Sequence, residues 1–176
     1  MTGCGLRLGA DLGGTWLRLC LIDGRSRVLK RGRFPSSPWP LAPKMLAAAL
    51  ERWGNPALSQ LTLGGKGLWR PADQRALARA LRRFAPKVRV LSDLELAHIA
   101  AFAGGPGVLL IAGTGSAALS RDARGRLHRA GGWGALLGDE GSAFWIGREA
   151  LKDPQLRRLW PADMAIRVGR GENPIR

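Results

Sequence analysis

Cysteine and histidine are scarce in this chain of 176 residues, with two of each. Cys4 and Cys20 fall in expected strands, which predicts reduced core side chains and argues against a disulfide or a metal-binding pair. His98 and His128 have no partners at metal-ligand spacing, so we interpret them as a helix-face residue and a strand residue. Disulfide-stapled domains and histidine or cysteine metal sites are therefore disfavoured.

Long apolar runs are also missing, because Gly, Arg or Pro interrupts each of them. The N-terminus lacks the basic, apolar and small-residue order of a signal peptide. Together these absences predict a cytoplasmic protein with no membrane partner. The hydrophobic fraction of 45% is nevertheless enough for a core, and the length suits one ordinary domain or two small ones.

Acidic residues are few, with 13 Asp and Glu against 28 Lys and Arg, so the formal net charge is +15. Such an excess suggests a polyanionic partner such as nucleic acid. However, the arginines are scattered singly, as in RALARALRRFAPKVRV at 75–90. No basic tail and no basic sheet interleaved with aromatics is present, which favours a solvated arginine-rich surface over nucleic-acid binding.

The hydrophobic pattern predicts an α/β chain with an internal repeat. A strand, a loop of Gly and Thr, a second strand, an Asp/Arg/Gly turn and a third strand occur in 6–32 and again in 107–130. A glycine-rich loop and a helix follow in 131–154, with Ser142 as the N-cap and Pro154 past the end. Between the repeats we expect helices at 44–54, 71–85 and 93–105 and strands at 61–65 and 88–93.

Asp11, Gly13, Gly14 and Thr15 lie where the first two strands meet. One interpretation is a tight hairpin turn, because glycine pairs are common there. The other is a phosphate loop, in which the glycines admit an anion to backbone N–H groups, Thr15 adds a hydroxyl donor, and Asp11 holds Mg²⁺ through water.

Gly113, Thr114, Gly115 and Ser116 form a second loop rich in donors. The run also fits the G-x-G-x-x-A dinucleotide fingerprint, but the turn at 122–125 leaves no room for the required helix. A Walker loop fails as well at 64–67, since neither Ser nor Thr follows the lysine. We therefore expect the two glycine hairpins to hold one polyphosphate from both sides.

Ser92-Asp93-Leu94-Glu95 carries two interpretations that are compatible. S-x-x-E is a capping box, and an acid at a helix N-terminus is favourable with the helix dipole. Asp93 also stands at a strand-to-helix junction, where it could take the proton of a hydroxyl that attacks a terminal phosphate.

Gly132, Trp133 and Asp139 belong to a final glycine-rich cluster. Trp133 could be plain core and Gly-Asp-Glu-Gly a plain turn. An aromatic face with carboxylates on loops is also typical of a sugar site, because the ring stacks on pyranose C–H surfaces while carboxylates accept hydroxyl hydrogen bonds.

The order of these motifs resembles the BadF/BadG-type ATPases of the actin-like, sugar-kinase and Hsp70-like superfamily, and within it N-acetylglucosamine kinases above all. The resemblance covers about residues 1–152 and rests on DLGGT at 11–15, the helix starting at Ser92-Asp93, LLIAGTGS at 109–116 and GGWGALLGDEGSAFWIGREAL at 131–151.

The resemblance implies two ribonuclease H-like lobes with ATP and Mg²⁺ in the cleft between them, and a small-molecule sugar as substrate. We expect a complete first lobe at 1–105 and the start of a second lobe at 106–176. It further implies that Asp93 is the catalytic base. The first phosphate loop would be Asp11, Gly13, Gly14 and Thr15, with Asp11 near the metal, and the second would be Gly113, Thr114, Gly115 and Ser116. Gly132, Trp133 and Asp139 would line the sugar pocket, and residues of the 64–68 loop could join them.

The family's second lobe continues well beyond this sequence and carries the adenosine-binding motif. We therefore expect a truncated chain, a homodimer or second chain that completes the lobe, or a non-catalytic sugar- or nucleotide-binding relative. The dehydratase-activator branch of the family is a further alternative, which Cys4 and Cys20 disfavour because neither is placed to hold an iron–sulfur cluster.

Overall fold

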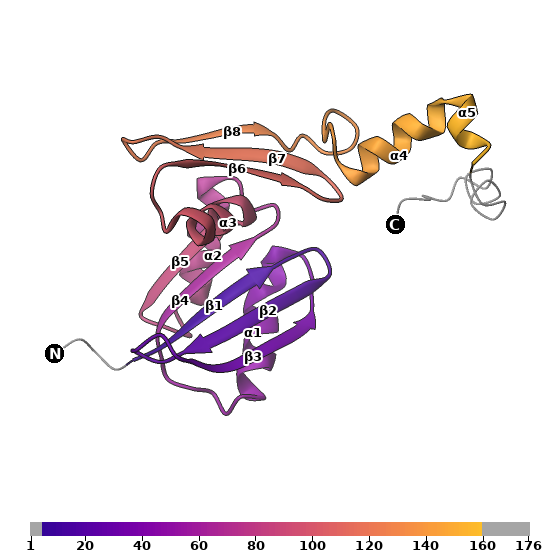
Figure 1. Cartoon of the computed structure of the whole chain (residues 1–176). Coiled ribbons are helices and arrows are strands. Elements are labelled where there is room, and N and C mark those ends of the chain that lie inside the picture. Colours follow the sequence, from indigo (N-terminus) through magenta and orange to yellow (C-terminus); the bar gives the residue numbers. More distant parts are fainter. Residues whose placement is uncertain (1–4, 160–176) are drawn as a thin grey trace. The chain divides into compact units, whose positions relative to one another are not determined.

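The computed structural model describes residues 5–159, and their contacts divide them into two compact units with the boundary after Ala100 (Figure 1). Unit 1 is built on a mixed sheet in the order β3-β2-β1-β4-β5. Its strands are β1 (Leu6–Leu12), β2 (Trp16–Ile22), β3 (Val28–Pro35), β4 (Leu58–Gly65) and β5 (Lys87–Ser92). The central strand of the first three, β2, pairs antiparallel with both β1 and β3, whereas β1, β4 and β5 run parallel.

The predicted helices of unit 1 are all present, with shifted ends. They are α1 (Ala42–Glu51), preceded by the short 3₁₀ helix η1 (Trp39–Leu41), then α2 (Pro71–Leu81) and α3 (Asp93–Phe102), which crosses the unit boundary. The second helix ends at Leu81, four residues before the expected end at 85. A left-handed residue, Ala103, and then Gly104 follow α3, in line with the expected glycine stop.

Strand alternation divides the unit 1 sheet into two different faces. In β1 and β2 the buried positions alternate, so Leu8 and Leu19 point into a core that α1 and α2 close with Leu46 and Leu81. The opposite face receives α3, whose Leu96 packs directly on Gly64 of β4. Over β1, β2 and β3 this opposite face is hollowed, with a volume of about 560 Å³.

Unit 2 contains an antiparallel sheet and two helices in its described part. The sheet has the order β6-β7-β8, formed by β6 (Gly107–Ala112), β7 (Ser116–Arg121) and β8 (Leu127–Gly131). Then come α4 (Ala143–Lys152) and α5 (Pro154–Arg157). The predicted cap is confirmed, because Ser142 accepts a hydrogen bond from the Trp145 N–H at 3.1 Å. Pro154 lies past α4 as expected and begins α5.

The internal repeat extends to individual hydrogen bonds. Asp23, in the turn from β2 to β3, accepts the backbone N–H groups of Arg25 and Arg27 at 2.8 and 2.9 Å. Asp122, in the turn from β7 to β8, accepts those of Arg124 and Arg126 at 2.9 and 2.8 Å. In both turns the arginine guanidinium also donates to the aspartate, and these bonds hold the pKa of each carboxyl below its usual range. The two three-stranded meanders are therefore built in the same way.

Cys20 corrects one sequence expectation. It is half-buried in β2 on the hollowed face of the sheet, outside the unit 1 core, because its neighbours Leu19 and Leu21 take the inward positions. Within the described part of the chain it is a free thiol, and Cys4 lies outside that part. Among residues 5–159 we find no helix with the length and apolar character that crossing a membrane requires.

Candidate functional site

The carboxyl ends of three parallel strands meet at one edge of the unit 1 sheet. Leu12 of β1 is in register with Gly65 of β4, which is in register with Ser92 of β5. Lys66 and Asp93 are the next residues along the chain. Ligands of open α/β sheets bind at this edge, where strands end and loops begin.

The DLGGT segment forms the hairpin between β1 and β2 at this edge. The Gly13 N–H donates to the Trp16 carbonyl at 3.0 Å, so the turn uses one of the amides expected for an anion. Gly14 and Thr15 are exposed. Neither Gly13 nor Gly14 has a left-handed φ, and a Cβ at Gly14 would meet nothing within 4 Å. Turn geometry therefore does not demand glycine at position 14, which favours the interpretation that a ligand approaches there.

Asp11 lies on β1 directly opposite Arg18 of β2, and the two form an ion pair with a distance of 2.9 Å between Arg18 Nη1 and Asp11 Oδ2. Among the described residues no group of three or more metal-ligating side chains occurs. Mg²⁺ does not require one, because it is commonly held by one or two carboxylates with substrate phosphates and waters. The half-exposed Asp11 fits that role if Mg²⁺ binds its carboxylate together with the Arg18 guanidinium or in place of it.

Asp93 begins α3 without serving as its main cap. Ser92 and Glu95 form the predicted capping box: the Ser92 N–H and hydroxyl donate to Glu95 Oε2 at 2.8 and 2.9 Å, and the Glu95 N–H donates to Ser92 Oγ at 3.2 Å. Asp93 accepts from the Leu94 N–H at 2.9 Å. Burial raises the pKa of the Asp93 carboxyl above its ordinary value, and the negative charge of Asp11 adds to this, while the Leu94 bond and the Lys66 charge act against it.

In unit 2 the loop between β6 and β7 is bound to the turn before α4. The Ser116 hydroxyl donates to the Glu140 carbonyl at 2.7 Å, and the Ala143 N–H donates to the Gly113 carbonyl at 2.8 Å. Gly113 and Thr114 are exposed. The structure therefore brings the expected second phosphate loop and the GDEGS turn together.

The three expected sugar residues lie around this loop in different settings. The Gly132 N–H donates to the Ser116 carbonyl at 2.9 Å. Asp139 is buried with a left-handed φ of 62°, and a Cβ at Gly115 would lie 2.6 Å from its Oδ2. Trp133 is 73% exposed, so it is not a core residue, which was the alternative to a role in a sugar site.

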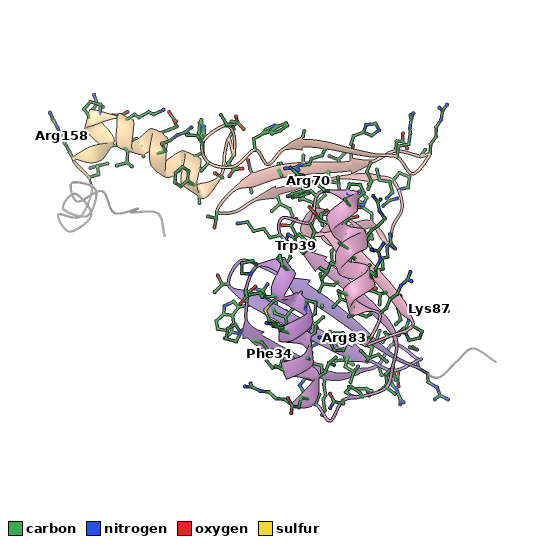
Figure 2. The ribbon with its side chains drawn as sticks, turned by 180° about the vertical axis from the view of Figure 1, so that it is seen from behind. Phe34, Trp39, Arg70, Arg83, Lys87 and Arg158 are labelled. Atoms are coloured by element: carbon green, nitrogen blue, oxygen red, sulfur yellow. The ribbon has the colours of Figure 1, made fainter. Side chains whose placement is uncertain are left out.

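Sequence reasoning missed the proline-rich linker as one wall of a hollow beside the first loop in unit 1. Its volume is about 270 Å³, and its polar lining comes from Ser36, Ser37 and Lys66, with Trp39 as the aromatic wall. Trp39 begins η1, the short helix that precedes α1 (Figure 2). The proline-rich linker 35–43 carried no motif, so only its position against Gly13 and Gly14 identifies it.

The expected site residues thus fall into two sets. Asp11, Gly13, Gly14, Thr15 and Asp93 belong to unit 1, and Gly113, Thr114, Gly115, Ser116, Gly132, Trp133 and Asp139 belong to unit 2. That both sets serve one polyphosphate stays a prediction.

Comparison with known proteins identifies relatives among sugar kinases. The chain is 35% identical over 96 residues to an N-acetylmuramic acid/N-acetylglucosamine kinase of Clostridium acetobutylicum, covering 53% of this chain and 31% of that protein. It is 48% identical over 46 residues to an N-acetyl-D-glucosamine kinase of Dictyostelium discoideum, covering 26% and 14%. The matches thus span less than a third of these curated relatives.

Solved structures confirm the predicted fold. A protein of Chromobacterium violaceum provisionally assigned as an N-acetylglucosamine kinase superposes with a TM-score of 0.66 at 26% identity, covering 86% of this chain and 57% of that one. A similarly assigned protein of Porphyromonas gingivalis gives a TM-score of 0.73 at 24% identity, covering 94% and 62%. A model of the BadF/BadG/BcrA/BcrD ATPase family matches residues 8–155, so the chain belongs to this family.

Proposed function

We propose that this chain works in the ATP-dependent phosphorylation of an amino sugar such as N-acetylglucosamine. The observation that carries the proposal is Asp93, a partly buried carboxylate with a raised pKa at the carboxyl edge of three parallel strands. A general base works best when its pKa approaches the working pH, and burial moves Asp93 in that direction. The names of the curated relatives supply the substrate class.

In the proposed reaction the sugar hydroxyl attacks the terminal phosphorus of ATP. The new bond joins the sugar oxygen to phosphorus, and the bond to the bridging oxygen breaks, so that ADP leaves with its electron pair. Asp93 accepts the hydroxyl proton. Gly14 and Thr15 would contact phosphate oxygens, and Asp11 would hold Mg²⁺, which neutralises developing charge on those oxygens when bound. The loop of Gly113 to Ser116 in unit 2, with its exposed Gly113 and Thr114, would also contact phosphate oxygens.

The test is Asp93→Asn in the full chain, compared with Glu51→Gln, which changes an exposed carboxylate at the end of α1. We expect sugar-dependent ADP formation to fall at least about 100-fold in Asp93→Asn, the lower end of typical general-base contributions, while calorimetry still detects sugar binding. Glu51→Gln should retain wild-type turnover. Unchanged turnover in Asp93→Asn would remove Asp93 from the catalytic role.

A second candidate function is sugar binding without phosphoryl transfer. The observation that favours it is the ion pair of Asp11 with Arg18, which occupies the carboxylate expected to hold the metal. This candidate predicts sugar binding by the wild-type chain with no ADP formation at any Mg²⁺ concentration. Turnover that depends on both sugar and Mg²⁺ would exclude it.

A further inference from the structure

Three segments far apart in the sequence converge beside the β1–β2 hairpin. The Ser36 hydroxyl donates to the Gly13 carbonyl at 2.6 Å, and the Ser36 N–H donates to the Thr15 carbonyl at 3.0 Å. On the other side the Lys66 N–H donates to the Leu12 carbonyl at 3.1 Å. These bonds hold the rim of the 270 Å³ hollow in place, so it is a formed feature of unit 1.

The hollow has the size and lining of a site for a small polar ligand. Its volume is close to the lower end of the range for small-molecule pockets, roughly 300–1,000 Å³. Trp39 supplies an apolar wall, since it is partly buried against the core, while Ser37 contributes a hydroxyl. A ring with several hydroxyls matches such a mixed surface.

Lys66 is the one charged residue in this lining. Its side chain is exposed, and its ammonium forms no ion pair within the described part of the chain. The Lys66 charge acts on the Asp93 carboxylate through space rather than by contact. A lysine held at the rim by its backbone, with its charge uncompensated by contact, is suited to an anionic group on a ligand.

We propose that Lys66 determines substrate specificity by binding an anionic substituent of the sugar, so that the preferred substrate is an amino sugar that carries a carboxylate. This inference rests on the proposed sugar-kinase function and deepens it. The hydroxyl and aromatic lining favours the body of a sugar in this hollow. A phosphate group of the nucleotide could also supply the anion that Lys66 binds, and the experiment distinguishes the nucleotide from the acidic sugar.

The experiment is calorimetric titration of the full chain with N-acetylmuramic acid, which carries a carboxylate, and with neutral N-acetylglucosamine. We expect the wild-type chain to bind the acidic sugar about tenfold more tightly, as is typical of a hydrogen bond to a charged group. Lys66→Met should lose this preference, and Lys66→Glu should reverse it by repulsion. Lys44→Met, an exposed lysine of α1 outside the hollow, is the matched control and should keep the preference.

Each outcome has a defined meaning. Equal binding of both sugars by the wild-type chain, or a preference that survives in Lys66→Met, overturns the role of Lys66 and leaves sugar binding standing. Binding of neither sugar overturns the proposed function itself. A parallel titration with Mg·ATP tests the other source: if Lys66→Met weakens nucleotide binding and preserves the sugar preference, Lys66 binds phosphate and the inference is wrong.

Discussion

Single side chains at the carboxyl edge of the unit 1 sheet carry the chemistry that we propose. Asp93 combines partial burial with the nearby charges of Asp11 and Lys66, and burial is the largest of these influences on its pKa. Ser92 and Glu95 complete the helix cap between themselves, so Asp93 is not needed for it. A carboxylate that the helix cap does not need, and whose charged form is disfavoured by burial, is typical of a functional residue.

The raised pKa of Asp93 makes a prediction about stability and pH. The folded state binds the Asp93 proton more tightly than the unfolded state, whose pKa is near the ordinary 3.8. The favourable contribution of the protonated group is complete below that value and is lost as pH rises through the folded pKa. Asp93→Asn should therefore become progressively more stable than wild type as pH rises from about 3 to 7.

Urea denaturation of both proteins across this pH range measures the effect. Glu51→Gln again serves as the control, because its carboxylate is exposed. A stability difference between Asp93→Asn and wild type that stays constant over the whole range would show that burial does not shift the Asp93 proton equilibrium.

At the scale of elements, the approach of α3 to the sheet depends on one missing side chain. Gly64 of β4 lies against Leu96, and a Cβ at Gly64 would be 2.5 Å from both Leu96 Cβ and Cδ2. Leu96 Cβ belongs to the rigid part of α3, so the helix itself would have to move. Because α3 starts at Asp93, this contact also positions the candidate base.

We expect Gly64→Ala to lower the free energy of unfolding by about 1–3 kcal/mol, the usual cost of overpacking a close contact. Gly9→Ala is the matched control on β1, since its Cβ would meet nothing nearer than the Cys20 carbonyl at 3.8 Å. That substitution should be neutral or stabilising by up to about 1 kcal/mol, because it restricts the unfolded chain. Urea denaturation compares the two variants, and equal effects would contradict the proposed contact.

At the scale of the whole molecule, the two repeats differ in what surrounds them. In unit 1 the first strand, β1, pairs with β2 on one edge and β4 on the other. Its counterpart β6 pairs only with β7 within the described residues, and Val108 and Leu110 on it are 71% and 70% exposed. An apolar strand with an open edge favours association with other chains.

Leu110→Lys should therefore reduce self-association of the purified chain, because a charge on an open edge strand opposes strand pairing. Sedimentation velocity over a range of concentrations measures this. Leu41→Lys introduces the same charge at an exposed leucine that belongs to the 3₁₀ helix η1 and to no strand, and should leave association unchanged. Equal behaviour of the two variants, or a wild-type chain that stays monomeric throughout, would contradict the prediction.

Much of the architecture follows from local patterns in the sequence. Alternation of apolar residues predicted β1 and β2, and the repeated pattern of strands and Asp/Arg/Gly turns at Asp23 and Asp122 predicted the internal repeat. The capping residues Ser92 and Ser142 also acted as expected. These features depend on a few neighbouring residues, because strand periodicity and helix caps are local properties.

Only the tertiary structure decided which distant residues meet. The packing of Leu96 on Gly64, the ion pair of Asp11 with Arg18 and the hollow around Lys66 all depend on strand pairing and on how a helix covers the sheet. The parallel pairing of β1 with β4 joins segments about fifty residues apart, whose register no local pattern encodes. The sequence suggested the 64–68 loop for a sugar pocket, but only the fold placed its Lys66 beside two serines of the proline-rich linker.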